Sequence, residues 1–95
     1  AFCPLGPWIV TGLDASDLSL RCWVNDSLRQ DGRTSDMVFS VGELISYASA
    51  VMTLEPGDVL MTGTPAGVSP VHPGDRVTVE IESIGRLENE VARHG

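Results

Sequence analysis

The sequence predicts a β-dominated α+β fold in which several strands are accompanied by one covering helix. Two stretches, residues 18–24 and 77–82, alternate apolar and polar side chains, as half-buried antiparallel strands do. Only residues 41–52 place apolar side chains convincingly at helical spacing. Counting shorter runs, we expect five or six strands against a single helix, which therefore packs on a sheet.

Length and composition place the chain among ordinary globular proteins. Its 95 residues allow one domain at most, and 42% of them are hydrophobic and 20% charged. A domain of this size buries roughly 60 to 65% of its unfolded surface, so it could fold alone with little margin. The chain opens without an initiating methionine, and we expect it to be a fragment.

The charge distribution argues against two classes of partner. The formal net charge is −7, the six arginines are scattered, and lysine is absent. Binding to nucleic acid or to an anionic membrane needs a basic face, so neither partner is expected. A lysine Schiff base or lysine general base would have to come from another segment. Cys3 and Cys22 lack metal-ligand spacing and read as small buried hydrophobes, and we expect a reducing, cytoplasmic location.

The first half of the chain predicts a short strand, a hairpin and a helix. Residues 8–10 form an apolar run after a segment rich in proline and glycine. Residues 18–24 are followed by turn-forming residues 25–27, so residues 28–30 form the short second arm of a hairpin. Ser40 and Glu43 have the spacing of a capping box at the start of the helix. Its apolar stripe is read as a core contact.

Residues 53–68 hold most of the functional information. Glu55 to Asp58 read as a β-turn, and the apolar run 59–61 then reads as a buried strand. Gly63 and Pro65 bend the chain and hold Thr64 at a loop tip. There the hydroxyl groups of Thr62 and Thr64, with nearby backbone N–H groups, could bind an anionic ligand. The alternative is an ordinary tight loop.

The last third of the chain predicts two strands. A second Pro-Gly-Asp turn at residues 73–75 precedes the alternating strand, and Gly85 permits a turn before a final strand at 87–91. Glu80 and Glu82 could bind a divalent cation with a third ligand, but a solvated strand face explains them more simply. His72 and His94 lie near no nucleophile motif, so a catalytic triad is not indicated.

Four ordered blocks carry a resemblance to a known family. They are "PLGPWIV" (4–10), "RQDGRTSDMVFS" (29–40), "MTLEPGDVLMTGTPAGV" (52–68) and "GDRVTVEIESIGRLENEV" (74–91). The chain resembles the fumarylacetoacetate hydrolase family over nearly its whole length. The likeness is strongest to the bacterial branch of 5-carboxymethyl-2-hydroxymuconate isomerases, the associated decarboxylases, acylpyruvate hydrolases and oxaloacetate decarboxylases.

The resemblance implies that residues 1–95 are the C-terminal part of a single catalytic domain with a mixed β-roll fold. It implies a metal-dependent enzyme of aromatic catabolism that acts on dioxo or 2-oxo acids by C–C bond hydrolysis, isomerisation or decarboxylation, as a cytoplasmic homodimer. The family's Mg²⁺, Mn²⁺ or Ca²⁺ ligands, its lysine and its His-Glu pair all precede the position of Ala1. Within this chain the resemblance assigns substrate binding to Thr64, with Thr62 and Gly63 shaping the contact, and assigns no catalytic or metal-binding residue.

A competing hypothesis is a non-enzymatic β-rich binding or interaction module. The absence of lysine and of a clear metal-ligand constellation in the sequence fits this hypothesis equally well. The two hypotheses differ in what the complete protein should contain. An enzyme requires an acidic metal-binding pair and a lysine elsewhere in the protein, whereas a module requires neither.

Overall fold

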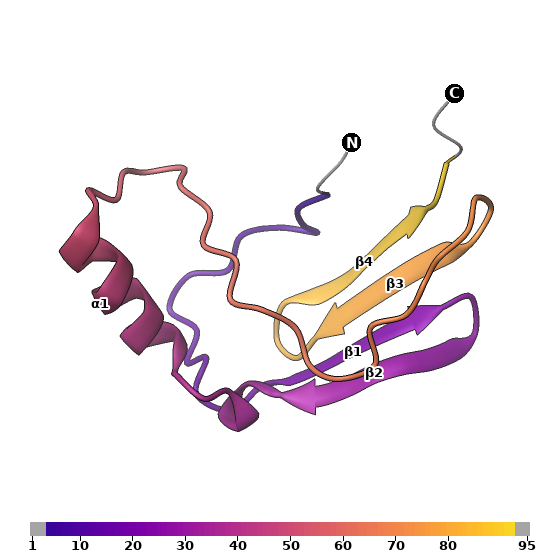
Figure 1. Ribbon diagram of the computed structural model, residues 1–95, viewed down its shortest axis with the longest axis horizontal. Coiled ribbons are helices and arrows are strands. Elements are labelled where there is room, and N and C mark those ends of the chain that lie inside the picture. The colour runs from indigo at the N-terminus through magenta and orange to yellow at the C-terminus, as the bar shows by residue number, and fades with distance from the viewer. Residues whose placement is uncertain (1–3, 93–95) are drawn as a thin grey trace.

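The computed structural model describes residues 4–92 and contains a four-stranded antiparallel sheet with one α-helix. Figure 1 shows two hairpins side by side, with the strand order β2-β1-β3-β4. The strands are β1 (Ser19–Val24), β2 (Ser27–Arg33), β3 (Arg76–Ile81) and β4 (Gly85–Glu90). The predicted β-dominated fold class with a single helix is confirmed.

The helix α1 (Val41–Val51) begins at the predicted capping box and ends one residue before the predicted limit. The Glu43 backbone N–H donates to Ser40 Oγ at 3.1 Å, and the Ser40 N–H donates to Glu43 Oε1 at 3.3 Å. A short 3₁₀ helix, η1 (Thr34–Asp36), links β2 to the approach to α1. In Figure 1, α1 lies beyond one end of the sheet rather than over its face, so the expectation that the helix covers the sheet is wrong for residues 4–92. Of its predicted apolar stripe, only Ala48 is buried. No helix in residues 4–92 has the length and apolar character needed to cross a membrane.

Both predicted Pro-Gly-Asp turns are present and are closed in the same way. The Asp58 N–H donates to the Glu55 carbonyl at 3.1 Å, and the Asp75 N–H donates to the His72 carbonyl at 3.0 Å. In each turn the aspartate carboxylate also accepts from the N–H three residues earlier, at 2.9 Å. Together with the Asn25 amide, the His72 N–H holds the pKa of Asp75 below its usual value.

Two predicted strands are wrong. Residues 8–10 and 59–61 are apolar, but neither run pairs with another strand in the part of the chain that the structure describes. A strand needs a hydrogen-bonded neighbour, and a three-residue run has too little periodicity to reveal whether one exists. Residues 4–92 therefore contain four strands rather than five or six.

The second arm of the first hairpin is longer than predicted. It was expected at 28–30 and runs over Ser27–Arg33, through Asp31 and Gly32, which are poor strand formers. Pairing with β1 along its length stabilises this arm despite its composition. The last strand, β4, begins two residues earlier than expected and ends at Glu90.

The core of the described residues is small. Leu18, Val24 and Ala48 are its buried hydrophobic residues, and Thr78 is a buried polar one. Cys22 is only half-buried, which corrects its interpretation as a buried hydrophobe. Cys3 and His94 lie outside the described residues, so the interpretations of these two residues cannot be compared with the structure.

Candidate functional site

Residues 62–69, which we call the threonine loop, lie against the edge strand β2. Figure 1 shows the connection from α1 to β3 running back across the first hairpin. Gly67 has a φ of +106°, and a Cβ there would overlap the carbonyl oxygen of Arg29. A Cβ on Gly32 would lie 3.3 Å from the Cβ of Pro65. Glycine at both positions therefore allows loop and strand to approach closely.

Side chains of β2 also bond the threonine loop. Gln30 Nε2 donates to Thr64 Oγ1 at 2.7 Å and to the Pro65 carbonyl oxygen at 2.8 Å. One residue earlier, Arg29 Nη1 donates to Ser69 Oγ at 2.5 Å. The loop is thus joined to β2 near both of its ends by contacts between residues 34 to 40 positions apart.

A cavity of about 620 Å³ lies beneath the threonine loop. Thr62, Gly63 and Thr64, the three predicted substrate-binding residues, all line it. The remaining lining is mostly apolar and comes from the sheet, from η1 and the approach to α1, from α1 itself and from one more residue of the loop: Leu20, Arg21, Cys22, Gln30, Arg33, Thr34, Asp36, Met37, Val38, Phe39, Val41, Leu44, Pro65, Val79 and Ile81. An apolar cavity with a few polar groups on one wall is typical of small-molecule sites.

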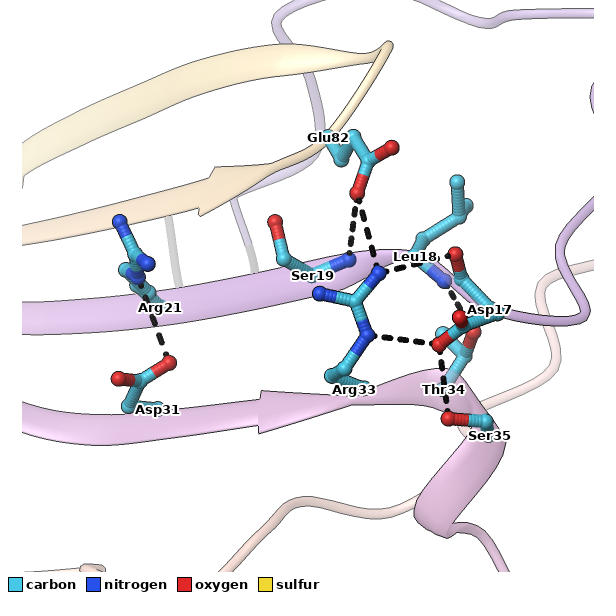
Figure 2. A network of polar contacts seen from close by, with 9 residues as sticks. All are labelled: Asp17, Leu18, Ser19, Arg21, Asp31, Arg33, Thr34, Ser35 and Glu82. Carbon is cyan, nitrogen blue, oxygen red and sulfur yellow. Dashed lines mark hydrogen bonds and ion pairs between the residues drawn. The ribbon is translucent and has the colours of Figure 1, made fainter.

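Arg33 lines this cavity but its guanidinium is engaged by carboxylates of the protein. Figure 2 shows Arg33 Nε donating to Asp17 Oδ1 at 2.7 Å, with Glu82 Oε1 at 3.6 Å from Arg33 Nη2. Ser35 Oγ donates to the same Asp17 oxygen at 2.7 Å. The bonds from Arg33 and Ser35 hold the pKa of Asp17 below its usual value, and Asp17 raises the pKa of Arg33.

The same network joins the ends of three strands (Figure 2). The Leu18 N–H donates to Thr34 Oγ1 at 2.7 Å, and the Ser19 N–H donates to Glu82 Oε1 at 3.0 Å. These bonds tie the start of β1 to the end of β2 and to the turn after β3. Arg21, which also lines the cavity, pairs with Asp31 at 3.3 Å. Both arginine charges are therefore paired within the sheet, which leaves neutral hydroxyl and backbone groups of the threonine loop to bind an anion.

Glu80 and Glu82 do not converge on a common point. Glu80 Oε2 accepts from Arg86 Nη2 at 3.1 Å, and the Arg86 guanidinium also lies 5.2 Å from the centre of the Trp23 ring. Glu82 bonds Ser19 and faces Arg33 instead. Within residues 4–92 no group of three or more His, Cys, Asp or Glu side chains could hold a metal ion. These residues do not fit a metal centre, and no chemical step is assigned to a metal held by them.

Cys22 lines the cavity through a free, half-buried thiol, and burial raises its pKa. A raised pKa keeps the thiol protonated and makes it a poor nucleophile. His72 lies in the turn before β3 and is not part of the cavity lining.

Gln30 is the residue of this site that sequence reasoning did not single out. The sequence places Gln30 at the end of the predicted second hairpin arm, and nothing local connects it to residues 64 and 65. The one signal in the sequence for a contact between this strand and the loop is Gly32, because a glycine inside a strand often marks the close approach of another backbone.

Comparison with known proteins identifies the family to which this site belongs. Residues 1–92 match the family model described as "Fumarylacetoacetate (FAA) hydrolase C-terminal". The chain belongs to the fumarylacetoacetate hydrolase family. This confirms the resemblance carried by the four sequence blocks.

Among solved structures, the chain is similar to a 5-carboxymethyl-2-hydroxymuconate delta-isomerase from Mycobacterium smegmatis, with 56% identity and a TM-score of 0.94. It is also similar to a maleylpyruvate hydrolase from Sphingobium sp. SYK-6, solved in complex with manganese(II) and pyruvate, with 46% identity and a TM-score of 0.94. The matches cover 98% and 99% of this chain, but only 37% of each of those chains.

A curated relative is the 4-hydroxyphenylacetate degradation bifunctional isomerase/decarboxylase of Salmonella dublin, which is 54% identical over 91 residues. That match covers 93% of this chain and 21% of the relative. The chain therefore spans well under half the length of the proteins it resembles. Relatives that are 48% to 56% identical over the matched segment are named as an isomerase, an isomerase/decarboxylase and a hydrolase, so similarity over this segment does not distinguish the reactions.

Proposed function

We propose that residues 1–95 are the C-terminal part of a single catalytic domain and form one wall of the active site of a longer fumarylacetoacetate hydrolase-family enzyme. The enzyme acts on a dioxo or 2-oxo acid by C–C bond hydrolysis or by a related isomerisation or decarboxylation, as a cytoplasmic homodimer. Relatives named as maleylpyruvate hydrolase and as isomerase/decarboxylase support this range of reactions. The pyruvate in one solved neighbour supports a small 2-oxo acid as the substrate class.

One observation carries the proposal: Thr64 lines the cavity, on a loop fixed to β2. We assign to Thr64 a hydrogen bond from its hydroxyl to the carboxylate or oxo oxygen of the substrate. Thr62 and Gly63 shape the same contact, and Gly63, with a φ of +98°, allows the bend that presents Thr64.

In this proposal, the reacting groups and the metal lie in another part of the complete protein. Manganese in the maleylpyruvate hydrolase structure supports a divalent cation, Mg²⁺, Mn²⁺ or Ca²⁺, in the enzyme as a whole. We place its ligands, the lysine and the catalytic base outside residues 4–92. This segment binds and orients the substrate and leaves the chemistry to the rest of the protein.

The test is Thr64→Val in the complete enzyme, assayed on acylpyruvates and oxaloacetate with Mg²⁺ or Mn²⁺. Valine keeps the β-branched shape and removes only the hydroxyl. A hydrogen bond to a charged group contributes roughly 1.5 to 3 kcal/mol, so kcat/KM should fall about tenfold to a hundredfold. Because the hydroxyl orients the substrate, most of the loss should appear in KM.

Thr53→Val is the matched control, since Thr53 is an exposed threonine of the same connection that does not line the cavity. It should leave both kinetic constants unchanged. If Thr64→Val instead lowers the melting temperature while kcat/KM stays normal, Thr64 serves only to fix the loop, and the proposed substrate contact is wrong.

A further inference from the structure

We propose that Gln30 is a positioning residue that directs the hydroxyl hydrogen of Thr64 into the cavity. The inference rests on the proposed function, because it concerns how Thr64 is prepared to bind a substrate oxygen. It assigns a role in recognition to a neutral side chain that lies 34 residues away in sequence.

An irregularity in the first hairpin brings Gln30 to the loop. Trp23 pairs with Leu28 and Cys22 pairs with Gln30, so Arg29 is an extra residue in β2. A β-bulge of this kind breaks the simple alternation of side chains and re-aims them locally. The Arg29 and Gln30 side chains accordingly both reach the threonine loop, one at Ser69 and the other at Thr64.

The orientation of the Gln30 amide follows from its second partner. The Pro65 carbonyl oxygen can only accept a hydrogen bond, so the Gln30 atom 2.8 Å from it must be the amide nitrogen. The same nitrogen lies 2.7 Å from Thr64 Oγ1. Its two hydrogens thus serve the two oxygens, one each, and Thr64 Oγ1 is an acceptor in this pair.

That assignment leaves the hydroxyl hydrogen of Thr64 available as a hydrogen-bond donor. A threonine hydroxyl has one hydrogen to donate, and Gln30 offers it no acceptor at this position. The hydrogen must therefore point to an acceptor other than Gln30. Thr64 lines the cavity, so a ligand oxygen bound there can accept it. A bond accepted from Gln30 also polarises the hydroxyl and makes it a better donor to a ligand oxygen. Gln30 itself need not touch the substrate.

The loop does not depend on Gln30 alone for its position. The Gly67 contact with the Arg29 backbone, the packing of Pro65 on Gly32 and the Arg29–Ser69 bond all remain when Gln30 is replaced. A change at Gln30 should therefore alter the direction of the hydroxyl while leaving the loop in place. This separates positioning from folding in an experiment.

The experiment is a double-mutant cycle in the complete enzyme with Gln30→Met and Thr64→Val. Methionine keeps an unbranched side chain of similar length but offers no donor. Gln30→Met removes the bonds to Thr64 and to the Pro65 carbonyl. Loss of the neutral bond to Thr64 predicts a fall in kcat/KM of about twofold to tenfold, mainly through KM. In the Thr64→Val background the same change should cost less than about twofold, because there is no hydroxyl left to direct.

A second variant, Gln30→Glu, reverses the hydrogen bond without changing size. The introduced carboxylate accepts the Thr64 hydrogen and takes it from the substrate, so kcat/KM should fall about tenfold or more, approaching Thr64→Val. Ser69→Ala is the control, because it removes the other side-chain bond between β2 and the loop. It should leave KM unchanged.

Three results would overturn the inference: an unchanged kcat/KM for Gln30→Met, equal losses from Gln30→Met with and without the Thr64 hydroxyl, or an equal effect of Ser69→Ala on KM. Each can occur while Thr64→Val still shows its expected loss, in which case the proposed function stands and only Gln30 is misassigned. If Thr64→Val itself leaves kcat/KM normal, the proposed function fails first, and the inference fails with it.

Discussion

The sheet and the region formed by α1 with the connection after it are stabilised in different ways. The central strands β1 and β3 pair on both sides, and Leu18 and Val24 are buried beside them. By contrast, Tyr47 on α1 is 73% exposed and Met61 in the connection is 82% exposed. The ion pairs of the described residues all lie on the sheet and its flanking residues, and none involves α1 or residues 52–71.

This contrast shows which part of the segment specifies its own structure. The strands pair with one another and their charged side chains form ion pairs within the sheet, whereas α1 and the connection leave most of their large apolar side chains exposed among residues 4–92. Solved relatives are nearly three times as long, since the match covers 37% of them, and we expect the additional chain to cover these surfaces. The threonine loop is where the two regions meet, because it belongs to the connection but is fixed to β2.

The largest expected effect comes from testing the segment without the rest of the enzyme. The 95 residues alone should show no turnover of acylpyruvates or oxaloacetate with Mg²⁺ or Mn²⁺, because the chain has no lysine and residues 4–92 hold no metal-ligand cluster. The complete protein, assayed in parallel, is the positive control. Metal-dependent turnover by the purified segment would show that a catalytic group had been missed here.

A smaller effect is expected from separating the loop from the sheet with Gly67→Ala. Alanine at φ +106° is strained, and its Cβ would overlap the Arg29 carbonyl. Gly74→Ala is the matched control, since Gly74 has a φ of +92° but nothing lies within 4 Å of the added atom. Both substitutions introduce backbone strain, but only Gly67→Ala adds a steric overlap. It should therefore lower the free energy of unfolding by about 1 to 3 kcal/mol more than Gly74→Ala does.

Chemical denaturation of the complete protein measures this difference, and KM reports whether the loop has moved. Gly67→Ala should raise KM, whereas Gly74→Ala should not. Equal unfolding free energies for the two variants, with equal KM, would mean that the loop is not fixed at the Arg29 backbone. The threonine loop would then not be the place where the connection is held against the sheet.

Sequence predicted well those parts of the fold whose causes are local. The capping box at Ser40 and Glu43, the two Pro-Gly-Asp turns and the alternation along β1 and β3 each depend on residues only a few positions apart. The prediction of a strand at 59–61 is wrong because three apolar residues do not reveal whether a strand partner exists. In this structure those residues belong to the poorly covered connection.

The site could be predicted only in part for the same physical reason. Thr62, Gly63 and Thr64 were found through local bends and through the family resemblance, and the structure places all three at one cavity. Their contact with a substrate remains a prediction. Gln30 was missed because its bond to Thr64 joins two elements 34 residues apart and depends on an extra residue in β2. No local pattern encodes that register.

The smallest effect is expected on the charged face of the sheet. Glu80 pairs with Arg86 through partly exposed side chains, and such surface pairs contribute at most about 1 kcal/mol. Glu82 accepts from the Ser19 N–H, and the carbonyl oxygen of a glutamine could accept the same bond. Both carboxylates are thus explained by the sheet, and neither needs a metal.

Replacing both Glu80 and Glu82 with glutamine should therefore leave the metal affinity of the complete enzyme unchanged and lower its stability by no more than about 1 kcal/mol. The matched control replaces Glu88 and Glu90 of β4 with glutamine, which removes the same two negative charges from a neighbouring strand. It corrects for any long-range effect of net charge on cation binding. Isothermal calorimetry with Mn²⁺ compares the two double variants. A tenfold or greater loss of affinity confined to the Glu80 and Glu82 variant would make these residues metal ligands and move the metal site onto the sheet.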